Sequence, residues 1–349
     1  MRILASPLDW GLGHASRLSC LIARLKGQGH EIVMAGSGAS LELLRNDFPE
    51  LRSVELKSFS PWFFRRLPQW IAISLQVPHF IYCCIREYIS LRRLISKEHF
   101  DLIISDNRYG LHSQSCRSVI VTHQLTPHIA SWCPAFVERL FARCLKRLID
   151  PFDEIWIPDD KPYPDGLSGD LSRTDAYDRE KIKYVGILSR LDAEADGWDR
   201  GIDYLAIISG PEPMRSHFER HIIDIFESLE GTRVIVRGLP GEGADKTRSD
   251  SNGIIYYNHC SNDVLSKVVA SATSIICHSG YSTILDLVHM RKRAYLIATV
   301  GQAEQEYLAK HCEMFSFVNI SSKYQNKYAT LQLLSRNTHC AISEQNRTC

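Results

Sequence analysis

Residues 274–287 read SIICHSGYSTILDL, which is an apolar run, a turn of small polar residues and the first turns of a helix. The apolar run predicts a buried strand that ends at Cys277, and the helix is expected to start near Ser282. A strand that passes into a helix through so short a turn is typical of parallel α/β sheets. The first N–H groups of such a helix have no partner inside it, so this turn is also a candidate anion site.

The composition of the turn predicts a site for a diphosphate. Hydroxyl groups and small side chains surround the expected helix N-terminus, and they belong to Ser279, Gly280, Ser282 and Thr283. Asp286 follows one turn into the helix, where a carboxylate can bond the diol of a ribose. A Ser-Gly turn alone is a weak signal, so other segments have to support it.

Two further loops of this half carry groups that suit a ligand. Residues 298–307, ATVGQAEQEY, leave the next predicted strand and begin another helix. Their amide and acid groups can bond the hydroxyls of a sugar, and these groups belong to Gln302, Glu304, Gln305 and Glu306. The alternative is an ordinary polar helix start. Residues 209–215 follow the first strand of this half, where Gly210 either shapes a tight turn or contacts the ligand.

Both halves of the chain alternate short apolar runs with helical patterns, which predicts parallel sheets with crossover helices. Residues 158–181 between them are rich in Pro, Gly, Ser and Asp, which predicts a loop leading to a domain boundary. We therefore expect two doubly wound, Rossmann-like α/β domains that face each other across a cleft, residues 1–187 and residues 188–349. The predicted strands are residues 2–6, 31–35, 101–105, 118–122 and 154–157, then 204–209, 233–237, 254–257, 274–277 and 293–298.

The first predicted strand leads into a glycine loop, residues 9–16, DWGLGHAS, and then a helix over residues 14–26. Gly11 and Gly13 allow the backbone to turn sharply and to approach a ligand. A dinucleotide-binding site is disfavoured, because Ser16 replaces the third glycine of that motif and no acid follows the second strand.

The glycine loop places His14 at the start of this helix, where the strand ends converge. The strand over residues 101–105 delivers Asp106 to the same edge of the sheet. A histidine oriented by an acid is the smallest unit that can deprotonate a hydroxyl. We predict that His14 is a general base and that Asp106 is its partner; a helix cap or a packing role for His14 is the alternative.

With these residues in view, the chain resembles the GT-B glycosyltransferases. It is most similar to the branch that contains the lipid II GlcNAc-transferase of peptidoglycan synthesis, which makes cell-envelope glycan. The runs HSGYSTILDL and GQAEQEY are similar to the donor half of that branch, and GLGH is similar to its N-terminal glycine loop. The likeness extends from Met1 to about His311.

The resemblance implies a UDP-sugar donor that is held mainly by the C-terminal domain. The diphosphate would lie on Ser279, Gly280 and Thr283, the ribose on Asp286, and the sugar on Gln305 and Glu306. His14 and Asp106 would match the paired histidine and acid of UDP-sugar transferases, and the acceptor side would include Gly11, Gly13, His123 and Gln124. Two residues depart from the family: His278 stands where relatives tend to carry Arg, and Glu306 replaces an amide.

Composition excludes several other classes of protein. A formal net charge of +1 argues against a nucleic-acid partner, and the 11 cysteines lack the C-x-x-C spacing of zinc sites. No Asp-x-Asp motif occurs, so we expect a reaction that needs no metal ion. We expect transfer of a hexose or N-acetylhexosamine with inversion and without another cofactor. The alternatives are a UDP-sugar 2-epimerase on the same fold and a non-catalytic sugar-nucleotide-binding protein.

The region of residues 62–93 bears on localisation. Residues 67–85 contain no charged side chain, but their prolines, glutamines and histidine disfavour a membrane span. With no signal peptide at the start, we expect a cytoplasmic protein. Aromatic residues mixed with arginines over residues 62–93 favour a helix that covers the domain with a solvated basic face. Peripheral contact with the inner membrane surface is the alternative, and a lipid-linked acceptor would agree with it.

Overall fold

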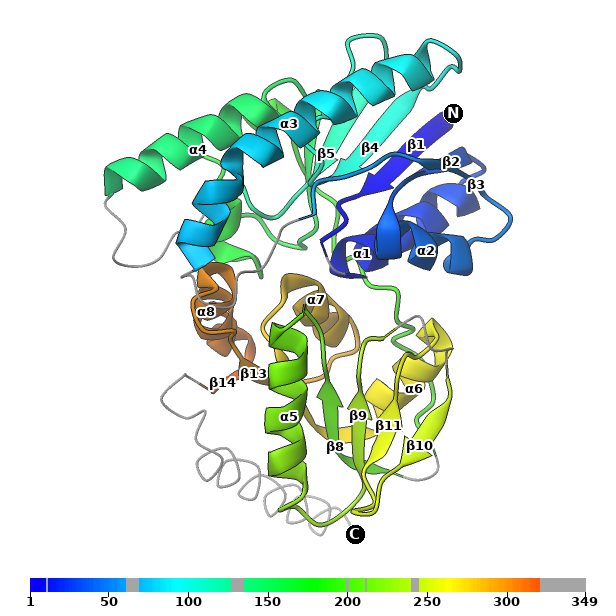
Figure 1. The fold of residues 1–349 in the computed structure, drawn as a ribbon, viewed down its shortest axis with the longest axis vertical. Coiled ribbons are helices and arrows are strands. Elements are labelled where there is room, and N and C mark those ends of the chain that lie inside the picture. The colour runs from blue at the N-terminus through cyan, green and yellow to red at the C-terminus, as the bar shows by residue number, and fades with distance from the viewer. Residues whose placement is uncertain are drawn as a thin grey trace.

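The computed structural model describes residues 1–10, 12–60, 69–126, 135–198, 201–210, 212–239 and 245–320. The side chains of residues 69–74, 135 and 137 are outside this description. The chain forms two α/β domains, each built on a seven-stranded sheet with helices packed on it (Figure 1). The two-domain, Rossmann-like architecture expected from the sequence is confirmed.

The first sheet is entirely parallel, with the strand order β3-β2-β1-β4-β5-β6-β7. This order reverses direction beside β1, as in doubly wound sheets. Its strands are β1 (Arg2–Pro7), β2 (Glu31–Gly36), β3 (Arg52–Glu55), β4 (Leu102–Asp106), β5 (Arg117–Val121), β6 (Glu154–Ile157) and β7 (Ile182–Tyr184). Its helices are α1 (Leu12–Gly27), α2 (Gly38–Asp47), α3 (Gln69–Ile95) and α4 (Ala135–Ile149).

The second sheet has the order β10-β11-β9-β8-β12-β13-β14, and only the edge pair β10 and β11 is antiparallel. Its strands are β8 (Ile202–Ile207), β9 (Arg233–Val236), β10 (Thr247–Ser249), β11 (Ile255–Tyr257), β12 (Ala272–His278), β13 (Tyr295–Ile297) and β14 (Val318–Asn319). Its helices are α5 (Met214–Phe226), α6 (Asn262–Ser271), α7 (Tyr281–His289) and α8 (Ala303–His311).

Every predicted strand is present, with ends within two residues of those observed. Residues 274–287 form most of β12 and most of α7, and β12 is buried along almost its whole length. That burial explains the unbroken apolar run, because a strand in a parallel sheet is covered on both faces. The short strands β3, β7, β10 and β14 were not predicted.

The predicted loop over residues 158–181 is a fixed part of the fold. The buried carboxylate of Asp159 accepts hydrogen bonds from the backbone N–H groups of Leu167 and Ser168. Leu167 and Leu171 then pack into the core of the second domain. The predicted boundary after residue 187 lies in the segment that joins β7 to β8.

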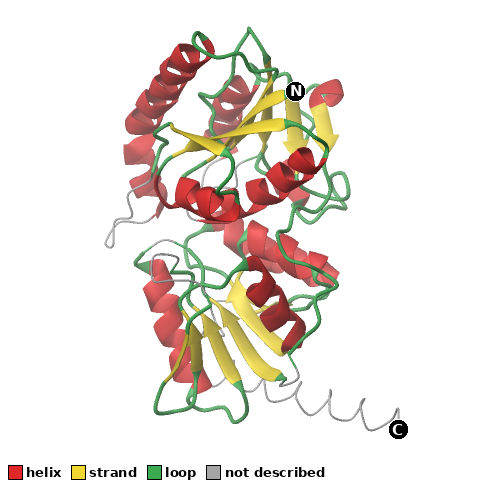
Figure 2. Cartoon of the chain, turned by 90° about the vertical axis from the view of Figure 1, so that its right-hand side faces the viewer, coloured by secondary structure: helices red, strands yellow, loops and turns green. Residues whose placement is uncertain are grey.

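The two domains, which Figure 2 shows one above the other, meet through α1 and α7. Carboxyl ends of parallel strands from both sheets therefore face the boundary between the domains. In Figure 1, α3 runs obliquely along the first domain, from its far end down toward α8. Within the described part of the chain, no helix combines the length and the apolar character needed to cross a bilayer.

Candidate active site between the two domains

The structure brings His14 and Asp106 together. β1 and β4 are neighbouring parallel strands, so the end of β4 places Asp106 beside the start of α1, which carries His14. The Nδ1 atom of His14 lies 2.7 Å from the Asp106 carboxylate. The Nη2 atom of Arg17 also lies 2.9 Å from Nδ1. The tautomer in which Nδ1 donates to the carboxylate leaves the Nε2 lone pair available to a substrate. The His14 side chain is 16% exposed and that of Asp106 is 0% exposed, so the imidazole can meet a substrate while the acid stays behind it.

Arg17 joins this pair, and the sequence analysis missed it. Its Nε donates to the second carboxylate oxygen of Asp106 at 2.5 Å, and its Nη2 donates to the first. Burial alone would raise the pKa of Asp106, but the positive charge of Arg17 and the contact with His14 hold that pKa below its usual value. The signal in the sequence is the spacing, since a residue three positions after His14 lies on the same helix face.

The contacts continue across the domain boundary to α8. The Nη1 atom of Arg17 lies 3.2 Å from His123 Nδ1, and His123 Nε2 lies 2.9 Å from the carboxylate of Glu304. Gln124 also donates to this carboxylate through its side-chain amide. The predicted acceptor-side residues His123 and Gln124 therefore contact a residue of the predicted donor loop.

The pKa shifts of this pair follow from its burial. Burial lowers the pKa of His123, and the contact with Glu304 only partly offsets this effect. Burial alone would raise the pKa of Glu304, but the hydrogen bond from His123 and the nearby cationic groups bring it below its usual value. We therefore assign a neutral imidazole beside a carboxylate near neutral pH.

Tyr281, the first residue of α7, packs against the same histidine. The Tyr281 and His123 rings are stacked with centroids 4.0 Å apart and planes 9° apart. The Tyr281 hydroxyl donates to the carbonyl of Pro158 at 2.7 Å and lies 3.2 Å from the Asp159 carboxylate. This buried tyrosine fixes the turn before α7 to the first domain.

The predicted diphosphate turn faces the N-terminal glycine loop directly. Ser282 donates through its hydroxyl to the carbonyl of Gly13 at 3.1 Å. A Cβ atom at Gly13 would lie 2.9 Å from the Ser282 hydroxyl, so a larger residue at this position would displace the Ser282 side chain. Gly280 caps α7, and Ser279 donates to the carbonyl of Gln305 at 2.7 Å. The N-termini of α7 and α8 therefore lie side by side.

Three predicted donor residues are engaged within the protein. The Gln305 side chain accepts from the N–H of Thr299 at 2.9 Å, and that of Glu306 accepts from the N–H of Gly301 at 2.8 Å. Both contacts fasten the loop before α8. Asp286 accepts from the Ser189 hydroxyl at 2.6 Å, and burial raises the pKa of Asp286. The roles of these three residues in donor binding remain predictions.

Of the other predicted site residues, some lie at described helix starts or loops, and Gly11 lies outside the described residues. Gln302 is the residue before α8, and Gly210 follows β8 with φ +106°, a conformation that favours glycine. Thr283 is partly exposed in the first turn of α7. Residues 61–68 of the region with candidate membrane contact are also outside the described residues.

His278 does not supply a cation in place of the family's arginine. Its ring stacks on Phe218 of α5, with centroids 3.8 Å apart, and its Nδ1 donates to the carbonyl of Ile297 at 2.8 Å. Burial lowers the pKa of His278, so the ring is neutral at physiological pH. Among the described residues, no cluster of His, Cys, Asp or Glu is suited to hold a metal ion.

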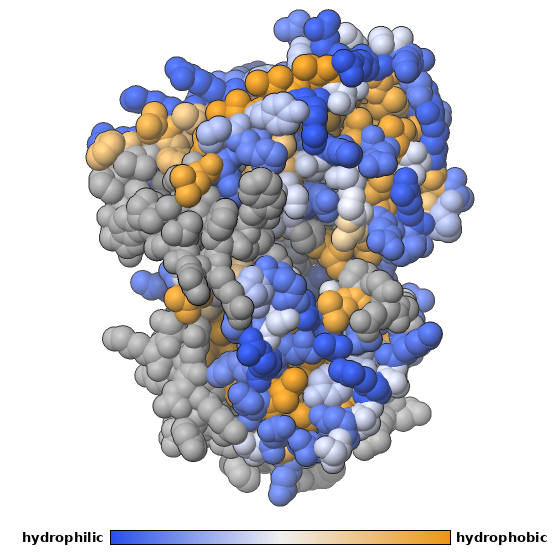
Figure 3. Space-filling model, viewed as in Figure 1, coloured by the Kyte–Doolittle hydropathy of each residue, from blue (hydrophilic) through white to orange (hydrophobic). Residues whose placement is uncertain are grey.

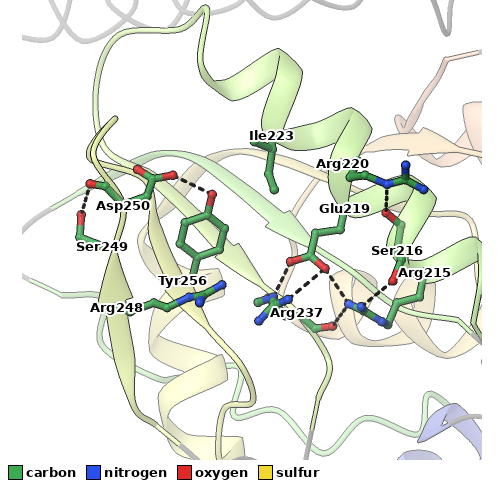
Figure 4. A pocket seen from close by; sticks show the side chains of 10 residues that line it. All are labelled: Arg215, Ser216, Glu219, Arg220, Ile223, Arg237, Arg248, Ser249, Asp250 and Tyr256. Atoms are coloured by element: carbon green, nitrogen blue, oxygen red, sulfur yellow. Dashed lines mark hydrogen bonds and ion pairs between the residues drawn. The ribbon is translucent and has the colours of Figure 1, made fainter.

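A polar groove of about 700 Å³ lies beside α5 and is separate from these contacts (Figure 4). It is lined by residues of α5, by Arg237 directly after β9, and by residues of β10 and β11, and it contains none of the predicted site residues. Arg215 and Arg237 both donate to the buried Glu219, which compensates much of their charge. The groove therefore does not replace the turn before α7 as a candidate diphosphate site.

Comparison with known proteins supports the fold. No sequence-family profile matches the chain, and no characterised protein matches it by sequence. Solved structures match over almost the whole chain. The spinosyn rhamnosyltransferase SpnG in complex with thymidine diphosphate has a TM-score of 0.63 at 13% identity, covering 96% of this chain and 91% of that one.

Two further solved structures match over a similar share of the chain, also at low sequence identity. Acinetobacter baumannii MurG has a TM-score of 0.56 at 11% identity, covering 97% of this chain and 90% of that one. Arabidopsis thaliana UGT89C1 in complex with UDP-L-rhamnose has a TM-score of 0.62 at 13% identity, covering 96% and 90%. The chain therefore has the GT-B fold that the sequence resemblance implied.

Proposed function

We propose that this protein is a glycosyltransferase that moves a hexose or N-acetylhexosamine from a UDP-sugar to an acceptor hydroxyl, with inversion. The observation that carries the proposal is the His14 and Asp106 pair, which lies across the domain boundary from the N-terminus of α7 in a GT-B fold. The pair can remove a proton, and the helix N-terminus can hold a leaving anion. Glycosyl transfer requires both of these actions, since the acceptor loses a proton and the donor loses a diphosphate.

In the proposed reaction, the acceptor hydroxyl gives its proton to Nε2 of His14. The acceptor oxygen bonds to the anomeric carbon as the bond from that carbon to the diphosphate breaks, and the electron pair leaves with UDP. Attack opposite the leaving group inverts the anomeric centre. Asp106 holds the Nδ1–H tautomer and stabilises the imidazolium that forms.

The leaving diphosphate is proposed to lie at the N-terminus of α7. Backbone N–H groups there, with the Thr283 hydroxyl, would stabilise the developing negative charge without a metal ion. The named complexes support this class of donor, since SpnG binds thymidine diphosphate and UGT89C1 binds UDP-L-rhamnose. UDP is the proposed nucleotide, and the transferred sugar is identified only by class.

We also propose that the first domain contacts an anionic membrane, where a lipid-linked acceptor would lie. Figure 3 shows hydrophobic residues over α3 and α4. The large apolar side chains that these helices expose are Leu75, Ile81, Tyr82, Ile85, Ile89, Phe136 and Leu140. Arginines on the same helices can meet lipid phosphates, and they are Arg86, Arg92, Arg93, Arg139, Arg143 and Arg147. Exposed apolar residues bordered by cations are typical of helices at a membrane surface.

A thermal-shift screen of nucleotides and nucleotide sugars tests the proposed function. A ligand that binds only the folded state at 100 times its dissociation constant stabilises it by about 2.7 kcal/mol. For a domain of this size that corresponds to a rise of several degrees in Tm. UDP and at least one UDP-sugar are expected to raise Tm, whereas a screen in which no nucleoside diphosphate does so would overturn the proposal.

A further inference from the structure

We propose that Arg17 is a positioning residue that fixes the catalytic pair and ties it, through His123 and Glu304, to the donor-side domain. This inference rests on the proposed function, because it assigns a role within the same reaction. Arg17 would not touch the substrate. It would act by holding Asp106, and therefore His14, in one orientation that depends on how α8 packs against the first domain.

Arg17 fixes the carboxylate of Asp106 through two hydrogen bonds. Arg17 donates to both carboxylate oxygens from one planar guanidinium group, and both side chains are almost completely buried. Two parallel hydrogen bonds fix the rotation of the carboxylate as well as its position. One carboxylate oxygen also faces His14 Nδ1, so the orientation of the imidazole follows from that of the carboxylate. A lysine would supply the charge without this fork.

Arg17 is also linked to the other domain through His123. The remaining terminal nitrogen of Arg17 faces His123 Nδ1, and a guanidinium can only donate. His123 Nδ1 is therefore the acceptor, and its proton is on Nε2, which faces Glu304. Between Arg17 and α8 the roles are therefore assigned: Arg17 donates to His123 Nδ1, and His123 Nε2 donates to Glu304. A shift of α8 away from the first domain would remove the acceptor of His123 and loosen the support of Arg17.

The charges of the side chains around Arg17 also support this role. With Asp106 and Glu304 ionised, Arg17 cationic and His123 neutral, these four side chains carry a net charge of −1. In the proposed reaction the acceptor proton is transferred to His14 beside this net negative charge. Arg17 keeps the two carboxylates from carrying an uncompensated charge of −2. A second cation in place of neutral His123 would remove the net negative charge.

The test compares Arg17→Lys, Glu304→Gln and His14→Ala for turnover, donor KM and UDP affinity per folded molecule. Misplacement of a catalytic group by about 1 Å costs about 10²-fold in rate. We expect Arg17→Lys to lower kcat by about 10- to 100-fold and Glu304→Gln by about 10-fold. UDP affinity should stay within about twofold, and donor KM within about threefold. Arg24→Lys is the matched control, because Arg24 is exposed on the same helix and bonds the Val185 carbonyl.

The outcomes separate this inference from the proposed function. If His14→Ala keeps wild-type turnover, the proposed base is wrong. If His14→Ala loses turnover while Arg17→Lys and Glu304→Gln keep kcat within twofold, the function stands and the positioning role is refuted. A rise in donor KM without loss of kcat in Glu304→Gln would overturn the link to α8 in favour of direct sugar binding. If Arg17→Lys does not fold, Glu304→Gln alone decides by the same criteria.

Discussion

Gly280 offers the cleanest perturbation of the proposed diphosphate site. It caps α7 with φ −74° and ψ 135°, a backbone conformation open to any residue. Among the described residues, a Cβ atom at this position would have only the Thr283 hydroxyl, at 4.0 Å, as a close neighbour. Gly280→Ala therefore adds one methyl group at the proposed diphosphate site without straining the backbone.

The expected effects on stability and on binding differ in size. Alanine is a poorer N-cap than glycine by about 1 kcal/mol, and the lower entropy of the unfolded chain offsets part of this loss. The free energy of unfolding should therefore change by about 1 kcal/mol or less, which is a few degrees in Tm. A methyl group forced into a filled site costs about 1–3 kcal/mol, which lowers UDP affinity about 5- to 150-fold.

Isothermal titration of UDP into wild type and Gly280→Ala measures this difference. Gly27→Ala is the control, because Gly27 ends α1 and a Cβ atom there would meet nothing within 4 Å. The control should bind UDP like the wild type. Equal UDP affinity in wild type and Gly280→Ala, with both folded, would refute close approach of the diphosphate to this turn.

Three other predictions follow from the same structure. Thr283→Ala removes a hydroxyl donor and should weaken UDP binding about 10- to 100-fold by calorimetry; unchanged affinity would place the phosphates elsewhere. Tm should fall as the pH drops from 7.5 to 5.5, because burial lowers the pKa of five histidines and the unfolded chain then binds more protons; a constant or rising Tm would contradict this. Glu87 and Asp286, with raised pKa values, act in the opposite direction but are fewer. In flotation with anionic vesicles at low salt, Ile81→Ser with Ile85→Ser should reduce binding more than Met314→Ser, an exposed apolar control in the second domain; no flotation of the wild type would exclude the membrane contact.

Much of the fold could be predicted from the sequence because the central strands are buried. β4 and β12 are buried almost throughout, and each contains a run of three adjacent apolar residues, residues 102–104 and residues 275–277. The strands that were missed lack this signal. β10 reads Thr247–Ser249 and is exposed at every position, and it exists because it pairs with the edge of β11. No local pattern marks such a strand.

The candidate site was predictable only where sheet topology determines proximity. His14 and Asp106 follow neighbouring parallel strands, so the same edge of the sheet brings them together. Arg17 is different, because a charged residue on an amphipathic helix is normally expected on its exposed face. Glu304 and His123 are 181 residues apart, and their contact depends on how two domains pack.

The loop before α8 shows a further limit of sequence reasoning. Gln305 and Glu306 have the chemistry to bond sugar hydroxyls, but the same groups can bond backbone N–H groups. In the structure they bond the N–H groups of Thr299 and Gly301. A pattern of amide and acid residues at a helix start does not distinguish these partners.

The rate of UDP release by wild type and by His14→Ala tests the central claim most directly. The donor is the UDP-sugar that gives the largest thermal shift, and water or an added alcohol serves as the acceptor. Loss of a general base lowers kcat by about 10²–10⁴-fold, and the donor is proposed to bind mainly on the other domain, so UDP affinity should change by less than about twofold. Turnover near the wild-type value in folded His14→Ala would contradict the assignment of His14 as the base.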